Sequence, residues 1–216
     1  MANYARSSCE LTYGATSALQ DPDLERTFVS TPASPTHYKH FKLTVGTSEE
    51  VVDLSEFTTV QEVYIKNHDA TNYVLAKGRG LTASKTYATN QLGFVDGGAG
   101  AADSITDAGS TFLTGLYFKA GDYAVVTGCT DTTANNTTFG PLSAAVAGTI
   151  TLPTAQTTTE AAEAGLVTVV CHSPFTTRIE GADAGWAKLT NVVPGSDLTL
   201  IANTAACIVE GVAFGT

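Results

Sequence analysis

The stretch Val-Gln-Glu-Val-Tyr-Ile-Lys-Asn at residues 60–67 decides the fold class of this chain. Apolar β-branched or aromatic residues are interleaved with polar ones along it, which is typical of a strand with one buried face. Turn-forming residues 68–72 and a second strand-like run at 73–76 follow. The sequence therefore predicts a β-hairpin with a loop of about five residues.

A second hairpin is predicted over residues 198–211, where two apolar runs flank a polar break at 203–204. Elsewhere, segments rich in Thr and Val are interrupted by Gly, Asn, Asp and Pro, and the residues that favour amphipathic helices are sparse. One short helical turn is possible at 159–164. We therefore predict an all-β protein with less than about 15% helix.

Changes in composition divide the chain into segments. Residues 1–40 are polar, contain prolines and lack a periodic apolar face, which indicates an extended N-terminal arm. The Gly/Ala run at 97–102 is interpreted as a linker and as the main boundary. Several short strand-like segments follow in residues 103–171, which predicts a small β-barrel or sandwich subdomain.

The charge of the chain excludes several classes of partner. Its 216 residues include 21 Asp and Glu against 11 Lys and Arg, a net charge of −10. Without a basic cluster, binding to nucleic acid or to an anionic membrane surface is not expected, and residues 77–80, the most basic stretch, are too short for a nucleic-acid groove. No apolar run approaches the roughly 18–20 residues of a membrane span. The first residues lack a secretory apolar stretch, so we expect synthesis in a cytosol without an export signal.

Cysteine and histidine positions give no catalytic pattern. The four cysteines are widely spaced, and buried, reduced thiols are expected. Cys171 and His172 are adjacent, so on a strand they point to opposite faces. His37 and His40 are three apart and also face opposite sides of a strand. His68 and Asp69 are interpreted as turn formers.

Acidic residues offer two weaker alternatives. Residues 96–103, with Asp107 nearby, loosely match glycine-aspartate calcium loops, although a linker is favoured. Glu160 and Glu163 lie on one side of the possible helical turn, but without a cleft they are interpreted as surface charge. We therefore expect no enzyme activity, no cofactor and no metal. Trp186 is expected to be partly buried.

The order of segments in residues 103–171 resembles a module that recurs in virion structural proteins of tailed bacteriophages. The matching positions are Asp103, Ile105, Thr106, Asp107, Phe112, Leu113, Phe118, Gly121, Asp122, Val125, Val126, Gly128, residues 149–152, residues 163–165 and residues 167–169. Residues 117–120 and the longer loop at 131–138 depart from that pattern. The flanks carry a second likeness, because residues 60–74 look like a hairpin of phage head and tail proteins, and residues 192–212 fill the place of its later Pro-Gly turn and closing hairpin.

The resemblance implies a jelly-roll-like β-sandwich made of residues 41–102 and 172–216, with residues 103–171 inserted in one of its loops. It also implies a structural virion protein, most simply a capsid decoration (cement) protein that stabilises the phage head by binding between capsid subunits. The expected partners are the major capsid protein or other virion proteins and further copies of the chain, and the expected location is the capsid surface. A neck or tail component, or a receptor- or carbohydrate-binding module, is the alternative.

The arm is the expected attachment element. It carries isolated apolar side chains, and ordering such a segment costs roughly 1–2 kcal/mol per residue. A neighbouring chain must therefore supply backbone partners and pockets before the arm gains stability. The candidate anchors are Leu11, Tyr13, Leu19, Leu24, Phe28 and Val29.

Overall fold

The computed structural model describes residues 36–109, 116, 118–181 and 185–216. Strands make up nearly all of the regular structure in these ranges, so the predicted all-β class is confirmed. The elements are β1 (His37–Val45), β2 (Glu50–Val51), β3 (Val60–Asn67), β4 (Val74–Tyr87), β5 (Leu92–Val95), β6 (Asp103–Asp107), β7 (Tyr123–Thr127), η2 (Thr133–Asn135), β8 (Thr138–Phe139), β9 (Ala144–Val146), β10 (Thr149–Leu152), β11 (Val167–Ile179), β12 (Trp186–Thr190), β13 (Thr199–Ala202) and β14 (Cys207–Gly215).

The first lobe packs two antiparallel sheets around one core. One sheet has the order β1-β14-β3-β12, and it faces β2-β13-β4-β11, which belong to a larger sheet. The inward side chains of these strands form a cluster that includes Val45, Val63, Ile65, Val74 and Val209, all almost fully buried. This alternation of buried and exposed positions is what the strand patterns predict.

The second lobe has its own core. The sheet β5-β6-β10-β9 packs against the other half of the large sheet, whose order is β2-β13-β4-β11-β7-β8. Its buried side chains run from Tyr87 to Cys171 in the sequence and include Phe94, Ile105 and Ile150. The two clusters share no residue, because the members of the first cluster lie on either side of this range.

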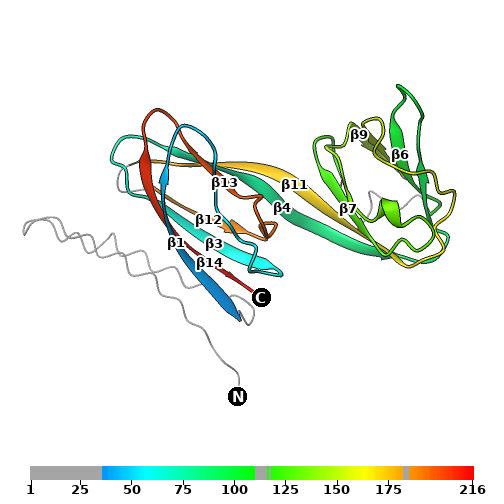
Figure 1. Cartoon of the computed structure of the whole chain (residues 1–216), viewed down its shortest axis with the longest axis horizontal. Helices are drawn as coiled ribbons and strands as arrows, with labels where there is room; N and C mark the ends of the chain where they lie inside the picture. The colour runs from blue at the N-terminus through cyan, green and yellow to red at the C-terminus, as the bar shows by residue number, and fades with distance from the viewer. Residues whose placement is uncertain (1–35, 110–115, 117, 182–184) are drawn as a thin grey trace, which may run out of the picture.

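Two long strands join the lobes. β4 and β11 pair along their whole lengths, from Val74 opposite Ile179 to Tyr87 opposite Val167, and Figure 1 shows them running from one lobe into the other. A β-bulge interrupts the ladder, because His172 is opposite Leu81 while Cys171 is opposite Ala83, which leaves Thr82 as the extra residue. The Thr82 hydroxyl donates a hydrogen bond to the carbonyl oxygen of Cys171, at 3.0 Å. A bulge bends and twists a strand locally, so it shapes the connection between the lobes.

Both predicted hairpins are wrong. β3 pairs with β14 and β12, whereas β4, which follows it, pairs with β13 and β11 in the opposite sheet. In the same way β13 and β14 lie in opposite sheets. The period of two fixes which side of a strand is buried, but two strands facing each other across a core have the same pattern as two neighbours in one sheet.

Two further expectations need correction. Residues 97–102 are a hairpin loop and not a linker, because β5 and β6 on either side of them pair with Val95 opposite Ser104. The possible helix at 159–164 is absent, and Glu160 instead forms an isolated bridge with Phe94. The second core therefore extends upstream of residue 103, the boundary taken from composition, although it does end at Cys171.

Candidate interaction surface

The outward face of the β1-β14-β3-β12 sheet carries an unusual collection of side chains. Strand register arranges them in rows across the sheet: Lys42, Glu210, Lys66 and Trp186; then His40, Val212, Tyr64 and Lys188; then Tyr38, Phe214, Glu62 and Thr190. The alternate residues of the same strands fill the core. We call this surface the basic face, because it gathers three lysines, His40 and the adjacent His68 around two carboxylates.

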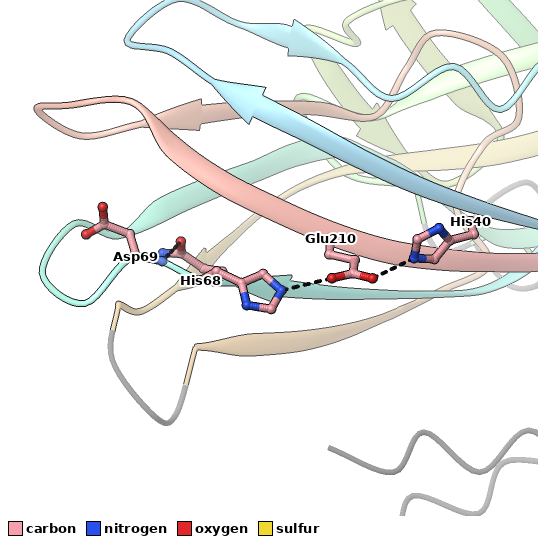
Figure 2. A network of polar contacts seen from close by, with 5 residues as sticks. His40, His68, Asp69 and Glu210 are labelled. Atoms are coloured by element: carbon pink, nitrogen blue, oxygen red, sulfur yellow. Dashed lines mark hydrogen bonds and ion pairs between the residues drawn. The ribbon is translucent and has the colours of Figure 1, made fainter. Parts of the chain in front are cut away.

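A hydrogen-bonded network crosses three strands of the basic face (Figure 2). His40 Nε2 on β1 donates to Glu210 Oε1 on β14 at 2.7 Å, and His68 Nε2, just beyond β3, donates to Glu210 Oε2 at 3.1 Å. Glu210 therefore uses one oxygen for each imidazole. The hydrogen bond from His40, together with the one from His68, lowers the pKa of Glu210 against the effect of desolvation.

Glu210 could not have been found from sequence. It lies 170 residues from His40 and 142 residues from His68 along the chain. The pairing of β14 between β1 and β3 brings the three side chains together. Asp69, in contrast, turns away from the network in Figure 2, and its Oδ1 accepts hydrogen bonds from the backbone amides of Thr71 and Asn72. Asp69 therefore has the turn-forming role that was predicted.

A second network lies next to the first on the same face. Lys188 Nζ is 2.6 Å from Glu62 Oε1, and this contact raises the pKa of Lys188. The Lys188 ammonium also lies 5.5 Å from the centre of the Tyr64 ring, which packs edge-to-face against Phe214. Trp186 is half-buried on this face, as expected, and is not part of the core.

The remaining histidine and cysteine candidates do not form a reactive pair. Cys171 is buried in the second core, where burial raises the pKa of its thiol to about 11. His172 lies on the opposite side of β11 and has a pKa lowered first by burial and then by Arg79. Among the described cysteines, Cys129 and Cys207 are also buried and free. These thiols are mostly protonated near neutral pH, which does not suit a nucleophile.

Two buried carboxylates that were weak candidates have structural roles instead. Asp103 Oδ2 accepts hydrogen bonds from the amides of Gln156 and Thr157 at 2.6 and 2.7 Å, and its Oδ1 accepts one from Gly97. Glu163 is only 1% exposed, so its interpretation as surface charge is wrong. Its Oε1 accepts hydrogen bonds from Thr130, Asp131 and Gly165, so it ties together loops of the second lobe.

An ion pair marks the junction between the lobes. Arg79 on β4 makes a bidentate contact with Asp197, with Nη2 2.7 Å from Oδ1 and Nε 3.1 Å from Oδ2. The same guanidinium lies 4.8 Å from the ring centre of Tyr123 at the start of β7. Asp197 precedes β13 of the first lobe, whereas β7 belongs to the second, so Arg79 contacts both lobes. The basic stretch at 77–80 is thus part of a strand that joins them.

The predicted arm anchors, Leu11, Tyr13, Leu19, Leu24, Phe28 and Val29, lie outside the described residues. Within the described ranges, no group of three or more His, Cys, Asp or Glu side chains is arranged to hold a metal ion. The same ranges contain no helix with the length and apolarity needed to cross a bilayer. Comparison with known proteins found no matching family model, no matching curated protein and no matching solved structure.

Proposed function

We propose that the chain is a structural virion protein of a tailed bacteriophage, most simply a capsid decoration protein that binds between capsid subunits. The observation that carries this proposal is the strand order of the first lobe. Its eight strands alternate between the two sheets along the chain except where β4 is followed by β11, and the sheets have the orders β1-β14-β3-β12 and β2-β13-β4-β11. That order is the one expected of a jelly roll with two Greek keys, an architecture common in viral capsid domains.

The second lobe supports the same proposal as an insertion. Strands β5 to β10 lie between the fourth and fifth strands of the proposed jelly roll, and their core is separate from the first. A long insertion in a surface connection costs little loop-closure entropy. On this proposal the second lobe provides a second surface, so that one lobe could contact the capsid while the other faced outward.

The proposed mechanism is binding by surface area and not catalysis. The edge strand β1 and the basic face offer backbone groups and charged side chains to a neighbouring subunit. Symmetry repeats each position on a capsid, so we expect the chain to form a homo-oligomer on the particle surface after synthesis in the host cytoplasm. This link from fold to function is an analogy between architectures.

The test is to purify the particles of the virus that encodes the chain and to measure its copy number against the major capsid protein. A decoration protein is expected at a copy number comparable to that of the capsid subunit, with extra density on the head in images of the particle. A chain starting at Thr36 should fold, but it should bind more weakly than the full chain to phage heads from which this protein has been removed. Absence of the chain from purified particles would contradict the proposal.

The alternative is a neck or tail component, or a receptor- or carbohydrate-binding module on the virion. A copy number far below that of the capsid subunit, as a single closed ring of subunits would give, would favour the neck or tail. Sugar binding requires a cluster of exposed aromatic rings. Tyr87 is buried, and Tyr73 and Tyr123 lie against different arginines. Tyr38 and Tyr64 share the basic face with Trp186, so this face is where sugar binding would be tested.

A further inference from the structure

We propose that the basic face is the docking surface for residues 19–28 of the N-terminal arm of a second copy of this chain. The inference is independent of the proposed virion function, since it concerns only contacts between copies. It is argued from the charge of the basic face, from the charge pattern of the arm and from the point at which the arm enters the first lobe.

The basic face has the opposite sign to the rest of the molecule. The chain as a whole has a net charge of −10, but Lys42 and Lys66 lie on either side of Glu210 in one row of the sheet. Neither lysine has an ion-pair partner among the described residues, and Glu210 is instead hydrogen-bonded to the histidines. These two ammonium groups are therefore available to an incoming carboxylate.

Exposed apolar side chains lie at both ends of the same face. Tyr38 is 75% exposed at one end, and Ile208, which pairs with Thr44 at the other end, is 48% exposed. Val212 lies between them and is half-buried. A partner segment that fits this face needs carboxylates in its centre and apolar groups on either side.

The arm contains a segment with that composition. Residues 19–28 read Leu-Gln-Asp-Pro-Asp-Leu-Glu-Arg-Thr-Phe, with carboxylates at Asp21, Asp23 and Glu25. In an extended segment, residues two apart point to the same side and are spaced by about 6.5–7 Å. The three carboxylates then share one side with the apolar Leu19, and Val29, which is also odd-numbered, follows on that side at the other end.

The connection to β1 directs this segment to another copy. Thr36 donates its backbone hydrogen bond to Gly215, so the arm enters the first lobe at the end of the face that carries Tyr38. Residues 29–35 can span at most about 25 Å, and Pro32 and Pro35 favour an extended backbone at the residues before them. An extended link of this length would carry the arm beyond the end of the sheet, whereas docking on the same chain would require a sharp reversal.

The test uses sedimentation velocity on the purified full chain with two charge-reversed variants. The arm variant is D21K/D23K/E25K and the face variant is K42E/K66E. The unaltered chain should associate at about 50 mM salt and dissociate at about 500 mM, because screening weakens exposed charge pairs. Each variant alone should associate at least about tenfold more weakly. A mixture of the two should recover association, since the reversed arm of one meets the reversed face of the other.

The control variant K77E/K119E has the same change in net charge as K42E/K66E, but its two substitutions lie away from the basic face. It should associate like the unaltered chain. Circular dichroism and thermal unfolding establish that each variant folds. A monomer under all conditions overturns the proposal, and so does a mixture that fails to recover association while both variants are folded. Association that neither variant weakens would place the contact elsewhere on the chain and would also overturn the proposal.

Discussion

Individual buried polar groups determine the loop structure of the second lobe. Glu163 illustrates this, because burial opposes its ionisation, yet hydrogen bonds from the amides of Thr130, Gly165 and Asp131 outweigh that effect and lower its pKa to about 2. Its ordinary pKa in an unfolded chain is near 4.5. The charged form is therefore worth more to the folded state than to the unfolded one.

Replacing Glu163 by Gln should reduce the free energy of unfolding by about 1–3 kcal/mol at pH 7, because charge-assisted hydrogen bonds are lost. The stabilisation by Glu163 is present above its unfolded pKa and is lost as the pH falls toward 2. Denaturant unfolding followed between pH 7 and pH 2.5 should therefore show the difference between the variant and the unaltered chain shrinking in acid. The exposed Glu180→Gln control should change stability little at any pH.

Close backbone packing gives a second residue-scale prediction. Gly211 on β14 lies where an added Cβ would overlap the ring of Phe41 and lie 2.6 Å from the carbonyl oxygen of Tyr64. Gly211→Ala should destabilise the first lobe by about 2 kcal/mol or more, since overpacking forces strained side chains and backbone shifts. Gly46→Ala is the matched control, because its Cβ would meet only the Ser48 amide nitrogen at 3.9 Å. Equal thermal stability of the two variants would contradict this account.

At the scale of a single element, β4 serves two cores with one strand. Before the bulge its buried residues have even numbers, Val74 and Ala76, whereas beyond it the inward residues have odd numbers, Ala83 and Tyr87. Thr82 is the extra residue that changes the parity. A regular alternation over all of β4 would have placed the residues beyond Thr82 on the wrong side.

Deleting Thr82 should leave both cores intact and change the angle between the lobes. The deletion brings Leu81 next to Ala83, and these residues already pair with the neighbouring His172 and Cys171, so the ladder becomes regular. The bend and twist of the bulge are lost. Small-angle scattering should report an altered overall shape. The free energy of unfolding should stay within about 1 kcal/mol of that of the unaltered chain. Thr82→Ala, which keeps the bulge, should keep the original shape.

At the scale of the whole molecule, the two cores divide cleanly at the bulge. The second cluster and the residues packed against it lie between Ala83 and Cys171, and every member of the first cluster lies outside this range. A cut at residue 103 would separate β5 from its partner β6 and expose Phe94. The register of β4 and β11 marks a better boundary than composition does.

Replacing residues 82–171 by Asn-Gly should leave the first lobe folded. Leu81 and His172 pair directly, and Asn-Gly is the preferred two-residue connection of a tight hairpin. Nuclear magnetic resonance spectra should show dispersed amide signals, and thermal unfolding should remain cooperative. Poorly dispersed amide signals from this shortened chain would mean that the first lobe depends on the second. A chain that lacks only residues 103–171 is expected to be less stable than this one, because the deletion removes part of the second core and leaves the remainder of that core exposed.

The sequence by itself determined the all-β class and the inward side of β3, because the period of two is a local property that residues 63–67 display without reference to any partner. It also indicated that Cys171 and His172 face opposite ways. Tertiary structure alone decided that β3 and β4 lie in opposite sheets, that residues 97–102 close a hairpin and that Glu163 is buried. It alone brought His40, His68 and Glu210 together. Strand partners are chosen by the packing of the whole chain around two cores, and residues more than a hundred positions apart carry no local signal of that choice.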